Sequence, residues 1–262
     1  MTLAQAGSGS GSGSGSGAAL EVHELRREFG GIKALDGVTF TVAAGERRGI
    51  IGPNGAGKTT LFNVLTGELR PTGGSVRLQG RDVTGKQAWQ LARRGLVRMY
   101  QRNELFEPLE TRENVALALG ARRGPYRPFT VAPADELEAA DALLDRVGLA
   151  GRERMPARSL SHGERRQLEL AVALAASPQV LLLDEPTAGM SPAETARIAE
   201  LIAALDRSLT ILIVEHDMDV VFRLADRISV LHEGRVIADG SAEEVRGDVR
   251  VNEVYLGKAV RT

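Results

Sequence analysis

Apolar and polar residues alternate in three short segments of the N-terminal third of the chain. Residues 20–25 and 38–42 each bring every second side chain to one apolar face, and residues 74–80 form a similar segment that ends at a glycine. A period of two residues is typical of a strand with one buried face. The pattern therefore predicts short strands and hairpins in this third of the chain.

From about residue 84 to residue 160 the pattern becomes helical. It is clearest in residues 136–147, where Leu137, Leu143 and Leu144 recur near helical spacing. We therefore expect a helical region between the N-terminal strands and the next apolar run.

Strands and helices alternate again after residue 180. Residues 180–183 and 210–214 are almost wholly apolar, which is typical of strands covered on both faces. Ser191 and Ser241 stand where a helix N-cap is expected. The other predicted elements of this region are two helices and a hairpin, at residues 192–205, 218–225 and 228–238.

Composition excludes several classes of function. With 262 residues and a net charge of −1, the chain has no overall field that would attract it to nucleic acid or anionic lipid. It has no cysteine, which excludes disulfides, thiolate catalysis and cysteine-based metal sites. No apolar run approaches the roughly 18 residues that span a bilayer. Residues 7–17 alternate glycine and serine, so we expect residues 1–18 to be a flexible linker.

The strongest motif follows the short apolar run at residues 48–51. It fits the pattern G-x-x-x-x-G-K-[ST] of loops that wrap nucleotide phosphates. A helical segment follows, so phosphates would lie at a helix N-terminus. Lys58 would contact the β- and γ-phosphates, and Thr59 would hold Mg²⁺. The predicted nucleotide-binding residues of this loop are Gly52, Pro53, Asn54, Gly55, Ala56, Gly57, Lys58, Thr59 and Thr60.

Two acidic residues directly follow the apolar run at 180–183. A phosphate loop on one strand and an aspartate at the end of a neighbouring buried strand make up the core of P-loop NTPases. In that arrangement Asp184 would hold Mg²⁺ and Glu185 would polarise an attacking water. The alternative is that both acids only end a strand before Pro186.

A second candidate anion site lies at residues 160–167. Ser161 and Glu164 have the spacing of a capping box that opens a helix, and Gly163 would let a phosphate approach. At this point the chain resembles the ATP-binding-cassette (ABC) ATPases, whose signature reads roughly Leu-Ser-Gly-Gly-Gln. Ser161 and Gly163 match that signature, whereas His162 and Glu164 depart from it.

The resemblance implies further roles. Gln101 would bind Mg²⁺ and sense a membrane partner, and His216 would contact the γ-phosphate. Phe29 would stack on adenine, although a phenylalanine after a strand is also ordinary core. ATP and Mg²⁺ are the implied cofactors. Two cassettes would enclose two ATP molecules, with Ser161 and Gly163 of one chain covering the ATP of the other.

The implied fold is α/β: a P-loop NTPase (ABC ATPase) core with an N-terminal antiparallel β-subdomain and an inserted α-helical subdomain. The ATPase domain would cover residues 19–258, with the helical subdomain at about 102–165. Residues 188–194, 215–221 and 254–257 resemble the ATPase subunits of branched-chain amino acid importers. The ATPases of urea and short-chain amide importers and of lipopolysaccharide exporters remain alternatives.

The same resemblance implies a peripheral subunit on the cytoplasmic face of a bacterial inner membrane. Its partners would be integral membrane permeases and a second ATPase subunit, either a copy or a paralogue. A periplasmic solute-binding protein would act indirectly. A cassette ATPase acting on nucleic acid is disfavoured, because the chain has no basic stripe, coiled-coil insertion or second cassette. The intact Lys58, Asp184, Glu185 and His216 disfavour a regulator that binds nucleotide without hydrolysing it.

Overall fold

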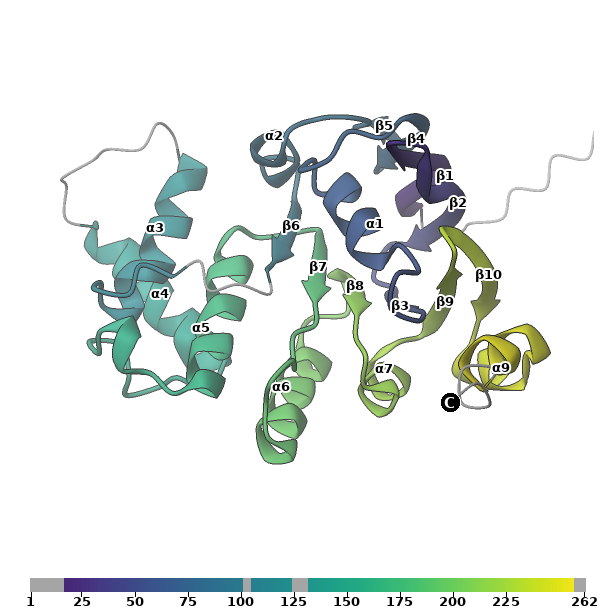
Figure 1. The fold of residues 1–262 in the computed structure, drawn as a ribbon. Coiled ribbons are helices and arrows are strands. Elements are labelled where there is room, and N and C mark those ends of the chain that lie inside the picture. Colours follow the sequence, from purple (N-terminus) through teal and green to yellow (C-terminus); the bar gives the residue numbers. More distant parts are fainter. Residues whose placement is uncertain (1–16, 101–104, 124–131, 257–262) are drawn as a thin grey trace, which may run out of the picture.

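The computed structural model describes residues 17–100, 105–123 and 132–256. It has the α/β fold expected from the sequence, with two sheets and a separate group of helices (Figure 1). Most of the expected Gly/Ser linker lies outside the described residues, and the first strand begins at Ala18. Within the described part of the chain, no helix is both long and apolar enough to cross a membrane.

The smaller sheet is antiparallel, as predicted for the N-terminal third. Its strand order is β2-β1-β4-β5, and the long β1–β2 hairpin forms most of it. The buried residues of β1 include Leu20, Val22 and Leu25, and in β2 every second residue from Val38 to Val42 is buried. The four strands are β1 (Ala18–Phe29), β2 (Ile32–Ala43), β4 (Gly73–Leu78) and β5 (Arg81–Asp82).

The larger sheet has the order β10-β9-β3-β8-β7-β6 and carries the buried apolar strands. Its strands are parallel except for β10, which pairs antiparallel with β9. Parallel strands are normally covered on both faces, which explains why the runs at 180–183 and 210–214 have no polar side. The six strands are β3 (Arg47–Ile51), β6 (Leu96–Met99), β7 (Val180–Asp184), β8 (Thr210–Val214), β9 (Arg227–His232) and β10 (Arg235–Gly240).

Strand β6 corrects the prediction of a continuous helical region from residue 84 to residue 160. Its four residues, Leu-Val-Arg-Met, pair with β7 at the edge of the larger sheet. The strand is short, and Arg98 interrupts its apolar sequence, so its pattern carries little strand signal. Its position is stabilised by pairing with β7 and by ion pairs from Arg98 to Asp184 and Glu68.

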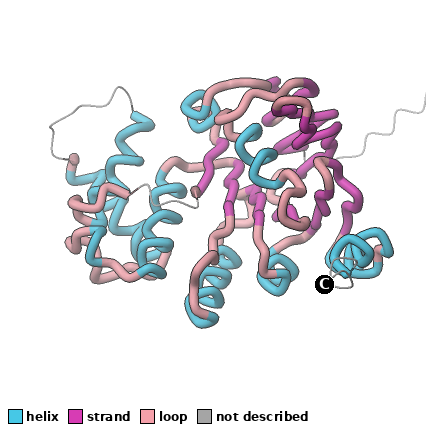
Figure 2. Tube along the Cα trace, viewed as in Figure 1, coloured by secondary structure: helices cyan, strands magenta, loops and turns pink. Residues whose placement is uncertain are grey.

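Helices cover both faces of the larger sheet (Figures 1 and 2). Leu182 packs in the core between the two sheets together with Phe62 of the helix after β3, whereas Leu181 and Leu183 face the core formed with the helices after β6. Ser161, Ser191 and Ser241 each cap a helix in a capping box, which confirms these predictions. The helices are α1 (Lys58–Leu65), α2 (Ala88–Ala92), α3 (Thr111–Arg123), α4 (Ala134–Arg146), the 3-10 turn η1 (Ala157–Ser159), α5 (His162–Ala175), α6 (Pro192–Ala204), α7 (Met218–Leu224), α8 (Ala242–Gly247) and α9 (Val249–Leu256).

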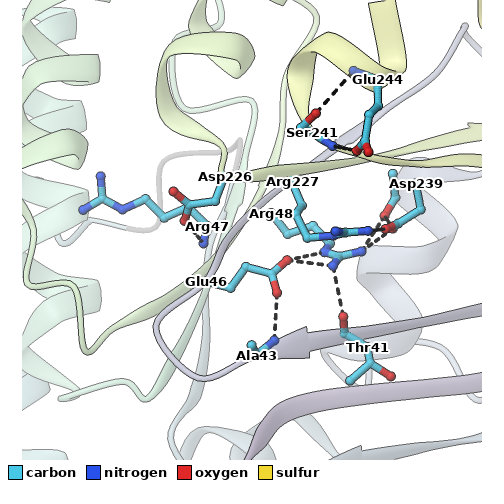
Figure 3. A network of polar contacts seen from close by, with 11 residues as sticks. Thr41, Ala43, Glu46, Arg47, Arg48, Asp226, Arg227, Asp239, Ser241 and Glu244 are labelled. Atoms are coloured by element: carbon cyan, nitrogen blue, oxygen red, sulfur yellow. Dashed lines mark hydrogen bonds and ion pairs between the residues drawn. The ribbon is translucent and has the colours of Figure 1, made fainter. Parts of the chain in front are cut away.

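A buried arginine joins the two sheets beside the β9–β10 hairpin (Figure 3). The side chain of Arg48, on β3, is only 3% exposed and forms ion pairs with Glu46 and Asp239. It also donates to the carbonyl of Thr41 on β2 at 3.0 Å. Arg227 donates to the other oxygen of Asp239 at 2.5 Å. This network fixes the position of β3, the strand that leads into the predicted phosphate loop.

Candidate functional site

The loop at residues 52–57 connects β3 to α1, the strand–loop–helix arrangement predicted for phosphate binding. Gly52 and Gly57 have positive φ angles of 154° and 106°. A Cβ atom at Gly52 would lie 2.1 Å from the carbonyl oxygen of Leu231, and one at Gly57 would lie 2.5 Å from that of Ala34. Only glycine fits the backbone at these two positions. The loop therefore packs closely against β9 and β2, which fixes its course.

The first turn of α1 is suited to binding an anion. Gly57 occupies the N-cap position and has no side chain to cap the first turn. Thr59 is exposed there, whereas Lys58 is buried. The N–H groups of a helix N-terminus attract anions because of their orientation and the helix dipole.

Lys58 reaches back over the loop. Its Nζ donates to the carbonyl oxygens of Gly52 at 2.6 Å and Pro53 at 3.1 Å. Burial lowers the pKa of its ammonium group, while the charges of Glu185 and Asp184 act in the opposite direction. An ammonium group has three donors, so Lys58 can hold the loop and still contact a phosphate.

The strand order brings the predicted acidic residues close to this loop. Strand β8 lies between β3 and β7, and all three are parallel, so their carboxyl ends lie at one edge of the sheet. Asp184 is the last residue of β7, and His216 follows β8 by two residues. Ligands of open α/β sheets bind at this edge.

Glu185 and His216 form a pair at this edge. Their Oε1 and Nε2 atoms are 2.7 Å apart, and the side chain of His216 is half exposed. Glu185 has a φ angle of 49°, and its N–H donates to the carbonyl oxygen of Val214 at 2.8 Å. Non-glycine residues seldom adopt this conformation, and such residues cluster at functional sites. The strained backbone turns the Glu185 carboxylate toward the end of β8.

Glu215 also belongs to the site, although the sequence analysis gave it no role. It is buried, and its Oε1 accepts hydrogen bonds from the Thr187 N–H at 2.8 Å and from the Thr187 hydroxyl at 2.6 Å. Its Oε2 accepts from the N–H of His216 at 3.1 Å. Glu215 thus ties the loop after Glu185 to the end of β8. A charged residue directly after a wholly buried strand was the signal that could have identified it.

Arg98 is the second residue that sequence analysis did not identify. Its Nη2 donates to Oδ2 of Asp184 at 2.5 Å, and its Nη1 donates to Oδ1 of Asn63 at 2.7 Å. Nη1 also lies 3.1 Å from Oε1 of Glu68. The side chains of Arg98 and Asp184 are 5% and 7% exposed. The only sign in the sequence was an arginine within a short apolar run.

The donor set fits a magnesium ion that is shared with a nucleotide. Thr59 supplies a hydroxyl at the start of α1, and Asp184 supplies a carboxylate at the end of β7. Within the described ranges, no group of three or more His, Cys, Asp or Glu residues could hold a metal by itself. Mg²⁺ needs no such group, because it is usually held by one or two carboxylates together with substrate phosphates. Gln101, the third predicted ligand, lies outside the described residues.

Phe29 ends β1 at the tip of the β1–β2 hairpin. The residue is 41% exposed, and the guanidinium carbon of Arg27 lies 4.4 Å from the ring centroid. The partner of Arg27 in the hairpin is Leu35, which lies beside Gly57 of the phosphate loop. Phe29 is two residues farther along the strand, roughly 7 Å at the usual rise.

Ser161 and Gly163 are in a different part of the chain from the phosphate loop. They open α5, which packs mainly on α3, α4, β6 and α6, away from α1 (Figure 1). Gly163 lies against Glu194 of α6, and His162 lies 3.5 Å from the carbonyl oxygen of Ala188. The structure thus brings together Lys58, Asp184, Glu185 and His216, but places Ser161 and Gly163 elsewhere.

Known proteins resemble this chain over nearly its whole length. A sequence profile of the ABC transporter family matches residues 35–188. LivG of Salmonella typhimurium, a high-affinity branched-chain amino acid transport ATP-binding protein, is 40% identical over 250 residues, which cover 92% of this chain and 98% of LivG.

Solved structures agree with this match. The ADP conformation of MJ1267, an ATP-binding cassette of an ABC transporter, superposes with a TM-score of 0.81 and is 32% identical, covering 92% of this chain and 99% of that one. The ATP-binding cassette MJ0796, solved as a dimer in a post-hydrolysis state with ADP and Pi, has a TM-score of 0.73 and is 25% identical, covering 85% and 98% of the two chains.

Proposed function

The chain belongs to the ABC transporter family, and from this premise we propose that it is the ATP-binding and ATP-hydrolysing subunit of an importer for branched-chain amino acids. The observation that carries the proposal is the convergence of four features at one edge of the larger sheet. Asp184 is the last residue of a parallel strand that ends there, and the phosphate loop, Glu185 and His216 follow parallel strands that end at the same edge. The similarity to LivG supports the choice of solute.

Binding would rest on the phosphate loop. The backbone N–H groups of residues 54–60 and the ammonium group of Lys58 would surround the phosphates, and the close packing at Gly52 and Gly57 fixes the course of this loop. Phe29 would stack on the adenine ring. Thr59, Asp184 and Gln101 would hold Mg²⁺, which neutralises charge that develops on the β- and γ-phosphate oxygens.

Hydrolysis would rest on Glu185 and His216. A carboxylate beside the phosphate loop can accept a hydrogen bond from water and orient it for attack on the γ-phosphorus. His216 lies within hydrogen-bond distance of Glu185, so it can hold that carboxylate and contact the γ-phosphate. Phosphoryl transfer depends mainly on positioning and electrostatic stabilisation, which these residues would supply.

A second ATPase subunit would complete the nucleotide site. Because Ser161 and Gly163 lie away from the phosphate loop of their own chain, we assign them to the ATP bound by a partner chain. The solved cassette MJ0796 is a dimer with bound ADP and Pi, which supports the pairing of two chains.

Membrane permeases would be the other partners. A groove of about 990 Å³ runs beside β6, and its lining includes Arg93, Arg94 and Tyr100, the residue before Gln101. We assign this groove to a permease segment, which would place the chain on the cytoplasmic face of the membrane.

The Glu185→Gln substitution tests the function. It preserves the shape of the side chain but removes its basicity, so ATP should still bind while turnover falls by about 10²–10⁴-fold, the usual contribution of a general base. Binding and phosphate release would be measured on the complex purified with its membrane subunits. Uptake of labelled leucine, compared with urea, would identify the solute.

Two outcomes would contradict the proposal. Wild-type turnover in the Glu185→Gln complex would remove Glu185 from its assigned role. Co-purification of the wild-type chain with nucleic acid instead of membrane subunits would favour a soluble cassette ATPase. Glu243→Gln, on exposed helix α8, is a matched control that should hydrolyse ATP normally.

A further inference from the structure

We propose that Arg98 is a positioning residue for Asp184 and that it determines how much Mg²⁺ strengthens nucleotide binding. The inference rests on the proposed function, because it takes Asp184 to be a magnesium ligand. Three features support it: the shared sheet face of the two residues, the buried charges around Arg98, and the position of Arg98 just before the segment that contains Gln101.

Strand register places Arg98 and Asp184 on the same face of the sheet. Arg98 pairs with Leu182 in the parallel β6–β7 ladder. Because side chains alternate along a strand, Leu182 and Asp184 point to the same face, and so does Arg98. That face is covered by α1, the helix that begins at Lys58. Arg98 therefore approaches Asp184 from within the layer that holds the phosphate loop.

Arg98 is held from several sides. Besides Asp184 and Glu68, it donates to Asn63, and its guanidinium carbon lies 5.8 Å and 4.8 Å from the ring centroids of Phe62 and Tyr100. The planar guanidinium presents donors in a fixed geometry, which lysine cannot reproduce. Such an anchored group restricts the orientation of the Asp184 carboxylate. Partners that orient metal ligands in this way typically change metal affinity or activity by about 10–100-fold when removed.

Loss of Arg98 has two opposing effects on Mg²⁺. Removing a positive charge would by itself favour a cation nearby. However, it would also leave Asp184 buried without its partner, and a buried charge that has lost its partner is strongly destabilised. Because the Asp184 carboxylate would lose the group that orients it, we expect the loss of orientation to outweigh the gain in charge.

Arg98 also connects the metal ligand to the sheet edge. It lies in β6, two residues before Tyr100, and the carbonyl oxygen of Tyr100 accepts a hydrogen bond from Arg166 of α5 at 3.0 Å. Arg98 itself lines the groove assigned to the permease. A displacement of β6 at that groove would therefore move Arg98 and change its hydrogen bond to Asp184.

The test measures binding rather than turnover. The Kd of a fluorescent ATP analogue would be determined on the full chain with excess EDTA and with excess Mg²⁺. In Arg98→Met the ratio of the Kd in EDTA to the Kd in Mg²⁺ should fall about tenfold relative to wild type. The Kd in EDTA should change little. Arg98→Lys retains the charge but not the planar guanidinium with its fixed set of donors, so its Kd ratio should lie between those of wild type and Arg98→Met.

Arg48→Met is the matched control. It removes an equally buried arginine of the same sheet, whose acidic partners are Glu46 and Asp239 instead of Asp184. It should lower the melting temperature and leave the Kd ratio unchanged. If Arg98→Met does not fold, Arg98→Lys decides the question.

The outcomes separate two failures. A wild-type chain whose nucleotide binding gains nothing from Mg²⁺ contradicts the proposed function. If Mg²⁺ strengthens nucleotide binding equally in the wild-type chain and in folded Arg98 variants, only the role of Arg98 is overturned. A drop in the ratio for both Arg98→Met and Arg48→Met would also overturn it, because any buried arginine would then have the same effect.

Discussion

At the scale of single residues, the site depends on side chains whose roles come from their neighbours. Glu185 has an unusual backbone conformation and pairs with His216. Glu215 holds the two segments that carry them, since its carboxylate accepts hydrogen bonds from both Thr187 and the His216 N–H. A carboxylate offers two acceptor oxygens, whereas an amide offers one acceptor oxygen and an NH₂ group that can only donate. Only the carboxylate can accept hydrogen bonds from both Thr187 and the His216 N–H.

Glu215→Gln should therefore impair hydrolysis more than binding. Either Thr187 or the His216 N–H would then face the NH₂ group of the glutamine, and a buried donor left without an acceptor costs about 1–3 kcal/mol. We expect kcat to fall about tenfold, which equals roughly 1.4 kcal/mol, with little change in ATP affinity. Steady-state phosphate release and nucleotide titration would measure the two effects. Thr187→Val, which replaces only the hydroxyl with a methyl group and keeps the backbone N–H, should have a smaller effect. A wild-type kcat in Glu215→Gln would remove Glu215 from the site.

At the scale of elements, the Arg48 network decides how β3 is anchored. Burial by itself would raise the pKa of Asp239, but hydrogen bonds from Ser229 and Arg227 and the charges of Arg48 and Arg227 lower it below its ordinary value of 3.8. A lowered pKa in the folded state means that the carboxylate stabilises the fold at neutral pH. That contribution is complete above the unfolded pKa and is lost as the pH falls through the folded one.

Arg48→Met should destabilise the protein by roughly 3–5 kcal/mol at neutral pH, because it leaves Glu46 and Asp239 without their buried partner. The difference from wild type should shrink as the pH falls through the lowered pKa of Asp239, where its carboxylate takes up a proton. Chemical denaturation at several pH values would measure it. Arg223→Met, which breaks an exposed pair with Glu200, is the control and should have little effect at any pH. A constant difference across the pH range would contradict the role given to Asp239.

At the scale of the whole molecule, the separation of α5 from the phosphate loop is the main feature. Within one chain, Ser161 and Gly163 lie beside α6 and the loop after Glu185. A symmetric pair of chains can bring these residues to the partner's nucleotide, since each surface then serves the other chain. The nucleotide site would thus be completed only on association.

Mixing two defective chains tests this arrangement. Lys58→Met damages the loop, and Gly163→Glu damages the start of α5, where a Cβ atom would already lie 2.9 Å from Oε1 of Glu194. Each variant alone should be inactive. A mixed pair retains one intact site, and half of the randomly formed pairs are mixed, so about one quarter of wild-type turnover should return. Phosphate release from the reconstituted mixture would measure it, and no recovery would contradict a site shared between copies of this chain.

The sequence by itself determined what depends on neighbouring residues. The phosphate loop, the buried runs of β7 and β8 and the capping boxes at Ser161, Ser191 and Ser241 are local patterns, and each was found where it was predicted. Glycine spacing, apolar periodicity and side-chain caps act within one or two turns of chain, so the sequence alone reveals them.

Only the tertiary structure decided what depends on long-range burial of charge. Arg98 and Asp184 are 86 residues apart, and Arg48 and Asp239 are 191 apart. No local pattern links such pairs, because a buried charge is stable only where the fold supplies its partner. For the same reason the sequence suggested a helix where β6 forms and gave Glu215 no role. The phosphate loop could be found in the sequence, but the burial of Arg98 against Asp184, on which our proposal for Arg98 rests, could be found only in the fold.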